Sequence, residues 1–127
     1  MNETQELQTV IADFLELGHV ENIVAMFRQD HACFTLTGAL LQDERFRVRM
    51  GVAVLFEELL LLVPAEALDG AVPSLVLLRE HTAPYVRGDA AHILATIDTP
   101  AARTALATFR YDPEPEVVAI VIEALGQ

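Results

Sequence analysis

The chain has 127 residues, of which 53% are hydrophobic and 21% are charged, so we expect one folded domain and exclude an intrinsically disordered chain. The net charge of −11 disfavours general binding to nucleic acid and to anionic membrane surfaces, because both carry negative charge themselves. All the basic residues are Arg, and the absence of Lys excludes Schiff-base chemistry and a P-loop lysine.

The chain shows no sign of export or of membrane insertion. Its single Cys cannot form an internal disulfide, and the polar, acidic start over Met1–Glu6 does not resemble a signal peptide. The longest apolar stretch, Val52–Val63, is interrupted by Glu57 and Glu58 and is too short to span a bilayer. We therefore expect a cytoplasmic protein with no membrane partner.

In chain order, apolar residues recur at helical spacing between Gly and Pro residues, and no segment alternates as a strand would. Gly18-His19 separates the first two apolar stripes, and Pro73 suits the first turn of a later helix. This pattern predicts an all-α fold of about eight helices, over residues 4–17, 19–29, 31–41, 44–62, 70–80, 84–97, 99–110 and 114–126.

Three segments of the chain align with one another when Val48, Val86 and Val117 are placed in register. The offsets of 38 and 31 residues suit helical-hairpin repeats. Asp before a helix caps it, Pro fits its first turn, and small residues such as Ala90 and Ala91 let helices pack closely. Because one hairpin cannot bury its own apolar face, we expect neighbouring hairpins to stack.

The third segment reads Asp112-Pro113-Glu114-Pro115-Glu116-Val117 and ends in Glu123-Ala124-Leu125-Gly126. It resembles the inner helix of HEAT repeats, in particular the short HEAT-like repeats of phycobilisome-lyase-type proteins. It departs from that pattern at Val118, where the family has Arg, and the first segment lacks both prolines. The resemblance implies an α-α superhelix in one domain over 1–127, with an N-terminal helix pair over 1–30 and repeats over 31–63, 65–97 and 98–127.

The resemblance also implies roles for individual residues. Asp43, Arg49 and Arg87 are expected to form a structural polar ladder between repeats. Positions one and five residues after the ladder Arg are expected to line the concave face. Four of these six residues are apolar or small, which predicts an apolar partner-binding strip made of Met50, Val54, Gly88, His92, Ala119 and Glu123. The alternative is that the array is short and flat and these residues pack together.

Other polar residues offer little for catalysis. Cys33 and His31 are two residues apart and do not face each other on a helix, so we interpret Cys33 as a core residue. The four His residues lack metal-ligand spacing, which predicts no metal and no cofactor. Glu57 and Glu58 point about 100° apart on a helix. We expect one in solvent and the other paired with an Arg of a neighbouring repeat.

Arg45, Arg47 and Arg49 crowd one predicted helix start, where cations oppose the helix dipole. A bound anion or an acidic partner could compensate them. We favour carboxylates of the chain itself, namely Asp43, Glu44 and those of adjacent repeats.

The last helix is apolar on nearly all sides, although a terminal repeat needs a polar outer face. Another copy of the chain, a neighbouring domain or a partner could cover this helix, and our hypothesis is a homodimer through Val118, Val121 and Ile122. As a whole, the sequence predicts a non-enzymatic adaptor that binds another protein. The alternative is an accessory protein or subunit of a cofactor- or chromophore-handling enzyme, as in the lyase-type relatives, with Arg87 and His92 at the rim of a pocket.

Overall fold

The computed structural model describes residues 2–126. Within this range all regular secondary structure is helical, and there is no strand. The α-helices in this range are α1 (Glu3–Glu16), α2 (Val20–Gln29), α3 (Thr37–Leu40), α4 (Phe46–Leu60), α5 (Val72–Leu77), α6 (Pro84–Ile97), α7 (Pro100–Ala107) and α8 (Pro115–Leu125). Three 3-10 segments join them, η1 (His31–Leu36), η2 (Ala65–Ala71) and η3 (Leu78–Glu80). The predicted all-α class is confirmed.

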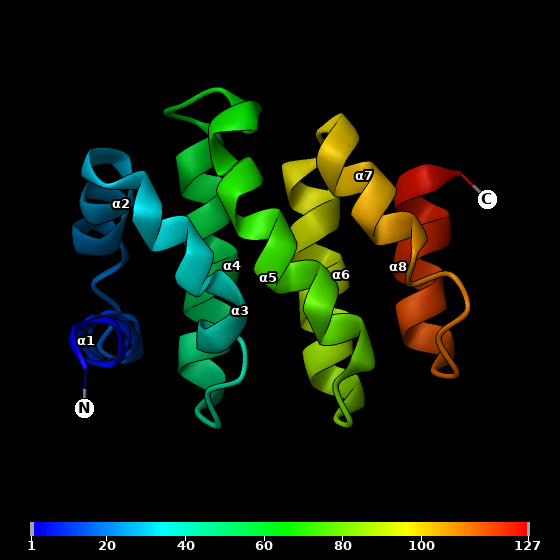
Figure 1. Cartoon of the computed structure of the whole chain (residues 1–127), viewed down its shortest axis with the longest axis horizontal. Helices are drawn as coiled ribbons and strands as arrows, with labels where there is room; N and C mark the ends of the chain where they lie inside the picture. The colour runs from blue at the N-terminus through cyan, green and yellow to red at the C-terminus, as the bar shows by residue number, and fades with distance from the viewer. Residues whose placement is uncertain (1, 127) are drawn as a thin grey trace.

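The helices lie in two layers (Figure 1). In one layer α4 packs on α6 and α6 packs on α8, and in the other α3 packs on α5 and α5 on α7. Helix α1 is seen end-on in Figure 1, so it runs across α4, and α2 also packs on α4. We call α4, α6 and α8 the inner helices. The candidate site described below lies on this row of helices.

Local chemistry sets most helix ends. The Asn2 side chain accepts the Gln5 backbone N–H at 2.8 Å and the Gln5 side chain accepts the Asn2 N–H in return, which forms a capping box. Pro84, Pro100 and Pro115 each occupy the first helical position, where the missing N–H costs nothing. These ends agree with the predicted ranges to within a few residues.

Two predicted helices contain 3-10 segments in the structure. The helix expected over 31–41 begins as η1, where the hydroxyls of Thr35 and Thr37 donate to carbonyls three residues earlier and compete with α-helical bonding. The helix expected over 70–80 is η2, α5 and η3 in succession. Pro73 has no N–H for the Asp69 carbonyl, which instead accepts from Val72, so an α-helix cannot run through this point.

The core is mainly aliphatic and runs through both layers, with a cluster of three Phe rings in its first half. The Phe34 ring meets the rings of Phe27 and Phe56 edge-on, with centroids 5.0 and 6.0 Å away. At Gly38, α3 approaches α5 so closely that an added Cβ would lie 2.6 Å from the Ser74 carbonyl oxygen. The Gly38 N–H donates to the Ser74 Oγ at 3.0 Å. Contact between these helices therefore requires a glycine at this position.

Substitution of Gly38 by Ala is expected to lower the free energy of unfolding by about 1–3 kcal/mol, because backbone must move to admit the methyl group. Gly88→Ala is the matched control. Its added Cβ meets only Val117 at 3.9 Å, and better helix propensity should leave stability unchanged or raise it by up to about 1 kcal/mol. Urea unfolding checks both. Equal stability of the two variants would contradict the close approach.

Candidate binding groove

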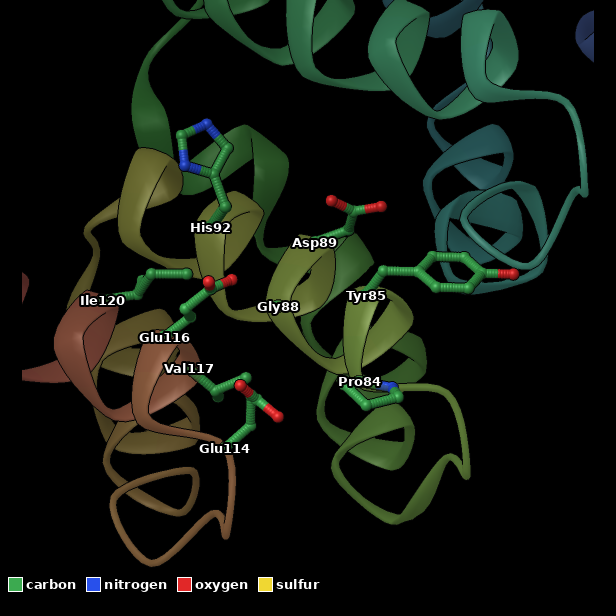
Figure 2. A pocket seen from close by; sticks show the side chains of 9 residues that line it. All are labelled: Pro84, Tyr85, Gly88, Asp89, His92, Glu114, Glu116, Val117 and Ile120. Carbon is green, nitrogen blue, oxygen red and sulfur yellow. The ribbon is translucent and has the colours of Figure 1, made fainter.

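A groove runs between α6 and α8 (Figure 2). Its first part has a volume of about 610 Å³ and is lined by Pro84, Tyr85, Gly88, Asp89, His92, Glu114, Glu116, Val117 and Ile120. A second hollow of about 390 Å³ shares His92 and Ile120 with the first and continues toward Glu123 and Ala124. The two hollows therefore form one groove along α6.

Carboxylates surround this groove. Glu114 and Glu116 project from the start of α8 into the space beside Gly88, whereas Asp89 and His92 rise from α6 (Figure 2). Glu123 stands in the second part of the groove. Within residues 2–126, the ion pairs leave out Glu114, Glu116 and Glu123, and no Arg lines the groove. The groove thus gathers negative charge that the described chain does not neutralise.

Asp89 differs from these glutamates because it touches a cation. Its carboxylate lies 3.4 Å from the Nε of Arg49 on α4, and the guanidinium of Arg49 stacks over the Tyr85 ring at 4.5 Å. Burial raises the pKa of Asp89 and outweighs the opposing effects of Arg49 and His92. Arg49 therefore offsets only part of the cost of removing the charge of the Asp89 carboxylate from water.

The loops before the inner helices share one capping device. Asp43, His81 and Asp112 occupy equivalent positions, and each accepts the backbone N–H two residues later. The distances are 2.9 Å from Arg45 to Asp43, 3.0 Å from Ala83 to the Nδ1 of His81, and 2.9 Å from Glu114 to Asp112. The acceptor role of His81 requires a neutral ring with its proton on Nε2.

The two ladder arginines donate to the carbonyls of the preceding loop in the same way. Nη1 of Arg49 donates to Asp43 and Glu44, and Nη1 of Arg87 donates to His81 and Thr82. Arg87 also forms a two-pronged contact with Asp112, with Nε donating to Oδ2 at 2.8 Å and Nη2 donating to Oδ1 at 3.2 Å. Arg87 thereby ties α6 to the loop before α8.

This Arg87–Asp112 pair is nearly buried, with side-chain exposures of 11% and 3%. Burial alone would raise the pKa of Asp112, but the hydrogen bonds from Arg87 and Glu114 and the charge of Arg87 together lower it. Arg49 has His81 at the position equivalent to Asp112, which offers no carboxylate. Arg49 turns to Asp89 and Tyr85 instead.

Asp43 takes a different place from the one expected in the ladder. Its carboxylate pairs with Arg45 at 3.0 Å, and Arg45 also reaches Asp13 of α1 at 3.0 Å, whereas only the backbone carbonyl of Asp43 contacts Arg49. The hydrogen bond from Arg45 lowers the pKa of Asp43 against the effect of its burial. Carboxylates of the chain thus pair with Arg45 and Arg49 at this crowded helix start.

The structure divides the predicted apolar strip. Gly88, His92 and Glu123 line the α6/α8 groove, whereas Val54 lines a separate hollow of about 420 Å³ between α2 and α4. Met50 and Ala119 are exposed and line neither hollow. Sequence reasoning missed the groove residues Asp89, Glu114, Glu116 and Ile120. The acidic run at the start of α8 was the available signal.

The remaining candidates lie apart from the groove. Cys33 is buried, and burial together with the charge of Asp30 raises its pKa. Glu57 and Glu58 are both exposed and form none of the described ion pairs, so the expected pairing with an Arg is wrong. Arg87 and His92 share no pocket among those lined by either residue, because Arg87 turns toward Asp112 on another side of α6.

Of the three residues predicted to form a homodimer contact, one lies in the core. Val121 is buried in the core, so it does not belong to an exposed contact. Ile122 is 49% exposed, and with Val118, Val121 and Arg110 it lines a shallow hollow at the end of the array. Ile122 and the half-buried Val118 are thus the residues of the predicted contact that solvent reaches.

Within residues 2–126, His, Cys, Asp and Glu nowhere gather in groups of three or more that could hold a metal ion. No helix in this range is long and apolar enough to cross a membrane. Comparison with protein-family models, with curated proteins and with solved structures gave no match.

Replacing Asp112 by Asn is expected to cost about 3 kcal/mol of unfolding free energy at pH 7, because Asn keeps the cap but leaves the buried Arg87 cation unpaired. Asp43→Asn is the matched control, with the same cap and more exposed partners, and it should cost less. Urea unfolding measures both variants. Similar losses would contradict a special role for the buried pair.

The same pair predicts a pH dependence. The folded-state pKa of Asp112 lies below the ordinary carboxyl value of about 3.9, so the unfolded chain takes up the proton first as pH falls. The stabilisation is therefore complete above that value and is lost as pH drops through the folded-state pKa. The stability difference between wild type and Asp112→Asn should shrink below about pH 4.

Proposed function

We propose that this protein is a non-enzymatic scaffold of HEAT-like helical hairpins that binds another protein along its inner helices. The proposal draws on the two-layer stacking of the helices and on the shared caps at Asp43, His81 and Asp112. The pairing of Arg87 with Asp112 across neighbouring hairpins agrees with a ladder between repeats. Stacked hairpins of this kind present extended surfaces that suit protein partners.

One observation carries the proposal. Val54, His92 and Glu123 are equivalent positions of the three inner helices, and each lines a hollow. Because α4, α6 and α8 pack in sequence, equivalent positions lie on the same face. A row of hollows on one face of a repeat array is a surface on which a partner can make several contacts in register.

The alternative, an accessory of a cofactor- or chromophore-handling enzyme, receives less support. It was expected to use Arg87 at a pocket rim. The guanidinium of Arg87 instead donates to Asp112, His81 and Thr82, and its side chain is nearly buried. An acidic groove also suits the carboxylates of a tetrapyrrole poorly, because like charges repel.

Val54→Glu is expected to weaken partner binding at least tenfold, because a charge enters an apolar contact at a cost of about 1–3 kcal/mol. Leu77→Glu is the matched control. It places the same charge at another exposed apolar residue, but on α5 in the opposite layer, where Leu77 is 73% exposed, compared with 36% for Val54. A partner is first retained from native lysate on the immobilised chain and then titrated in purified form.

Thermal melting confirms that both variants fold. Equal affinity of Val54→Glu and wild type would contradict a partner surface at α4. Light scattering that shows only self-association, with no other protein retained from lysate, would count against the adaptor as a whole.

A further inference from the structure

The α6/α8 groove has a charge pattern that points to the chemistry of its occupant. Four carboxylates line its two parts, those of Asp89, Glu114, Glu116 and Glu123. Three of them form none of the described ion pairs, and the lining contains no Arg. Acidic walls that face one hollow repel anions and attract cationic groups, and a concave shape concentrates that field.

The groove already shows how it receives a cation at one edge. Arg49 reaches from α4 and places its guanidinium over the Tyr85 ring at 4.5 Å and beside the Asp89 carboxylate at 3.4 Å. Both Tyr85 and Asp89 line the groove. An aromatic face and a carboxylate together form a favourable seat for a guanidinium. This intramolecular contact is independent of the glutamates on α8.

The shape of the groove suits an extended chain. It follows α6, whose 14 residues span about 20 Å. An extended peptide rises about 3.3 Å per residue, so about six residues fit along the groove. Gly88 presents no side chain beside Val117, and Val117 and Ile120 add apolar lining between the acidic walls. Such a lining accommodates the aliphatic stems of Arg or Lys below their charged ends.

We propose that the α6/α8 groove binds an extended, cationic segment of a partner protein, with Arg or Lys side chains placed among Glu114, Glu116 and Glu123. The inference rests on the proposed function as a protein-binding scaffold and names the chemistry of the bound segment. The charge of the partner segment complements both the groove and the net charge of −11.

The test uses the whole chain and a fluorescein-labelled hexapeptide of alternating Arg and Ala, followed by fluorescence anisotropy. The wild type is expected to bind this peptide, and to bind a hexapeptide of alternating Gln and Ala at least tenfold more weakly. The variant Glu114→Gln/Glu116→Gln/Glu123→Gln should lose about tenfold in affinity for the Arg peptide, because three exposed charge pairs with the peptide are removed and each contributes only modestly.

The matched control is Glu3→Gln/Glu6→Gln/Glu66→Gln, which changes the net charge equally at exposed positions of α1 and η2. Its affinity should stay within about twofold of wild type, because distant charges are screened in salt. Circular dichroism checks that both variants fold. Equal loss in the two variants would reduce the binding to general charge attraction and would overturn the proposal, as would equal binding of the Gln and Arg peptides or no binding at all.

Failure of this inference is separable from failure of the scaffold function. If the groove variant captures a protein partner as well as wild type does, and Val54→Glu weakens that capture, the scaffold function is supported and the cationic occupant of the groove is excluded. Binding of the Arg peptide that requires Glu114, Glu116 and Glu123, with capture insensitive to Val54→Glu, supports the groove and counts against a partner contact on α4.

Discussion

The buried pair of Arg87 and Asp112 is the interaction on which the second half of the structure depends. Arg87 sits on α6, yet its guanidinium holds the loop before its own helix and the loop before α8 at the same time. Both side chains are nearly buried, so loss of either partner would leave an uncompensated charge in the interior. The contact thus fixes α8 against α6, and the two helices together form the groove.

The first half of the array is joined by different means. The loop before α4 carries the same cap, at Asp43, but its carboxylate turns to Arg45 and through it to Asp13 on α1. Arg49 has no carboxylate in the next loop, where His81 stands, and it crosses to Asp89 and Tyr85 on α6. One repeated position therefore makes two kinds of contact, according to which residue the following loop supplies.

The acidic character of the groove follows from these contacts. The chain has few cations, and the described ion pairs employ Arg45, Arg49, Arg79, Arg87 and Arg103, none of which pairs with Glu114, Glu116 or Glu123. The glutamates at the start of α8 suit the positive end of that helix dipole, which explains why they are tolerated at that end. Their side chains then face a hollow in which the described chain places no Arg.

The sequence by itself determined the all-α class and most helix bounds, because helical periodicity and Pro or Asx signals act over about four residues. Pro84, Pro100 and Pro115 each begin a helix where that reasoning places one. The segments η1 and η2 were not predicted, because the hydroxyls of Thr35 and Thr37 and the missing N–H of Pro73 determine them. Only the tertiary structure decided which polar groups meet. Glu116 and His92 line one groove because α6 and α8 pack against each other, with Val117 next to Gly88, and Arg49 meets Asp89 because α4 packs on α6. Both arrangements depend on side chains that lie far apart in the chain.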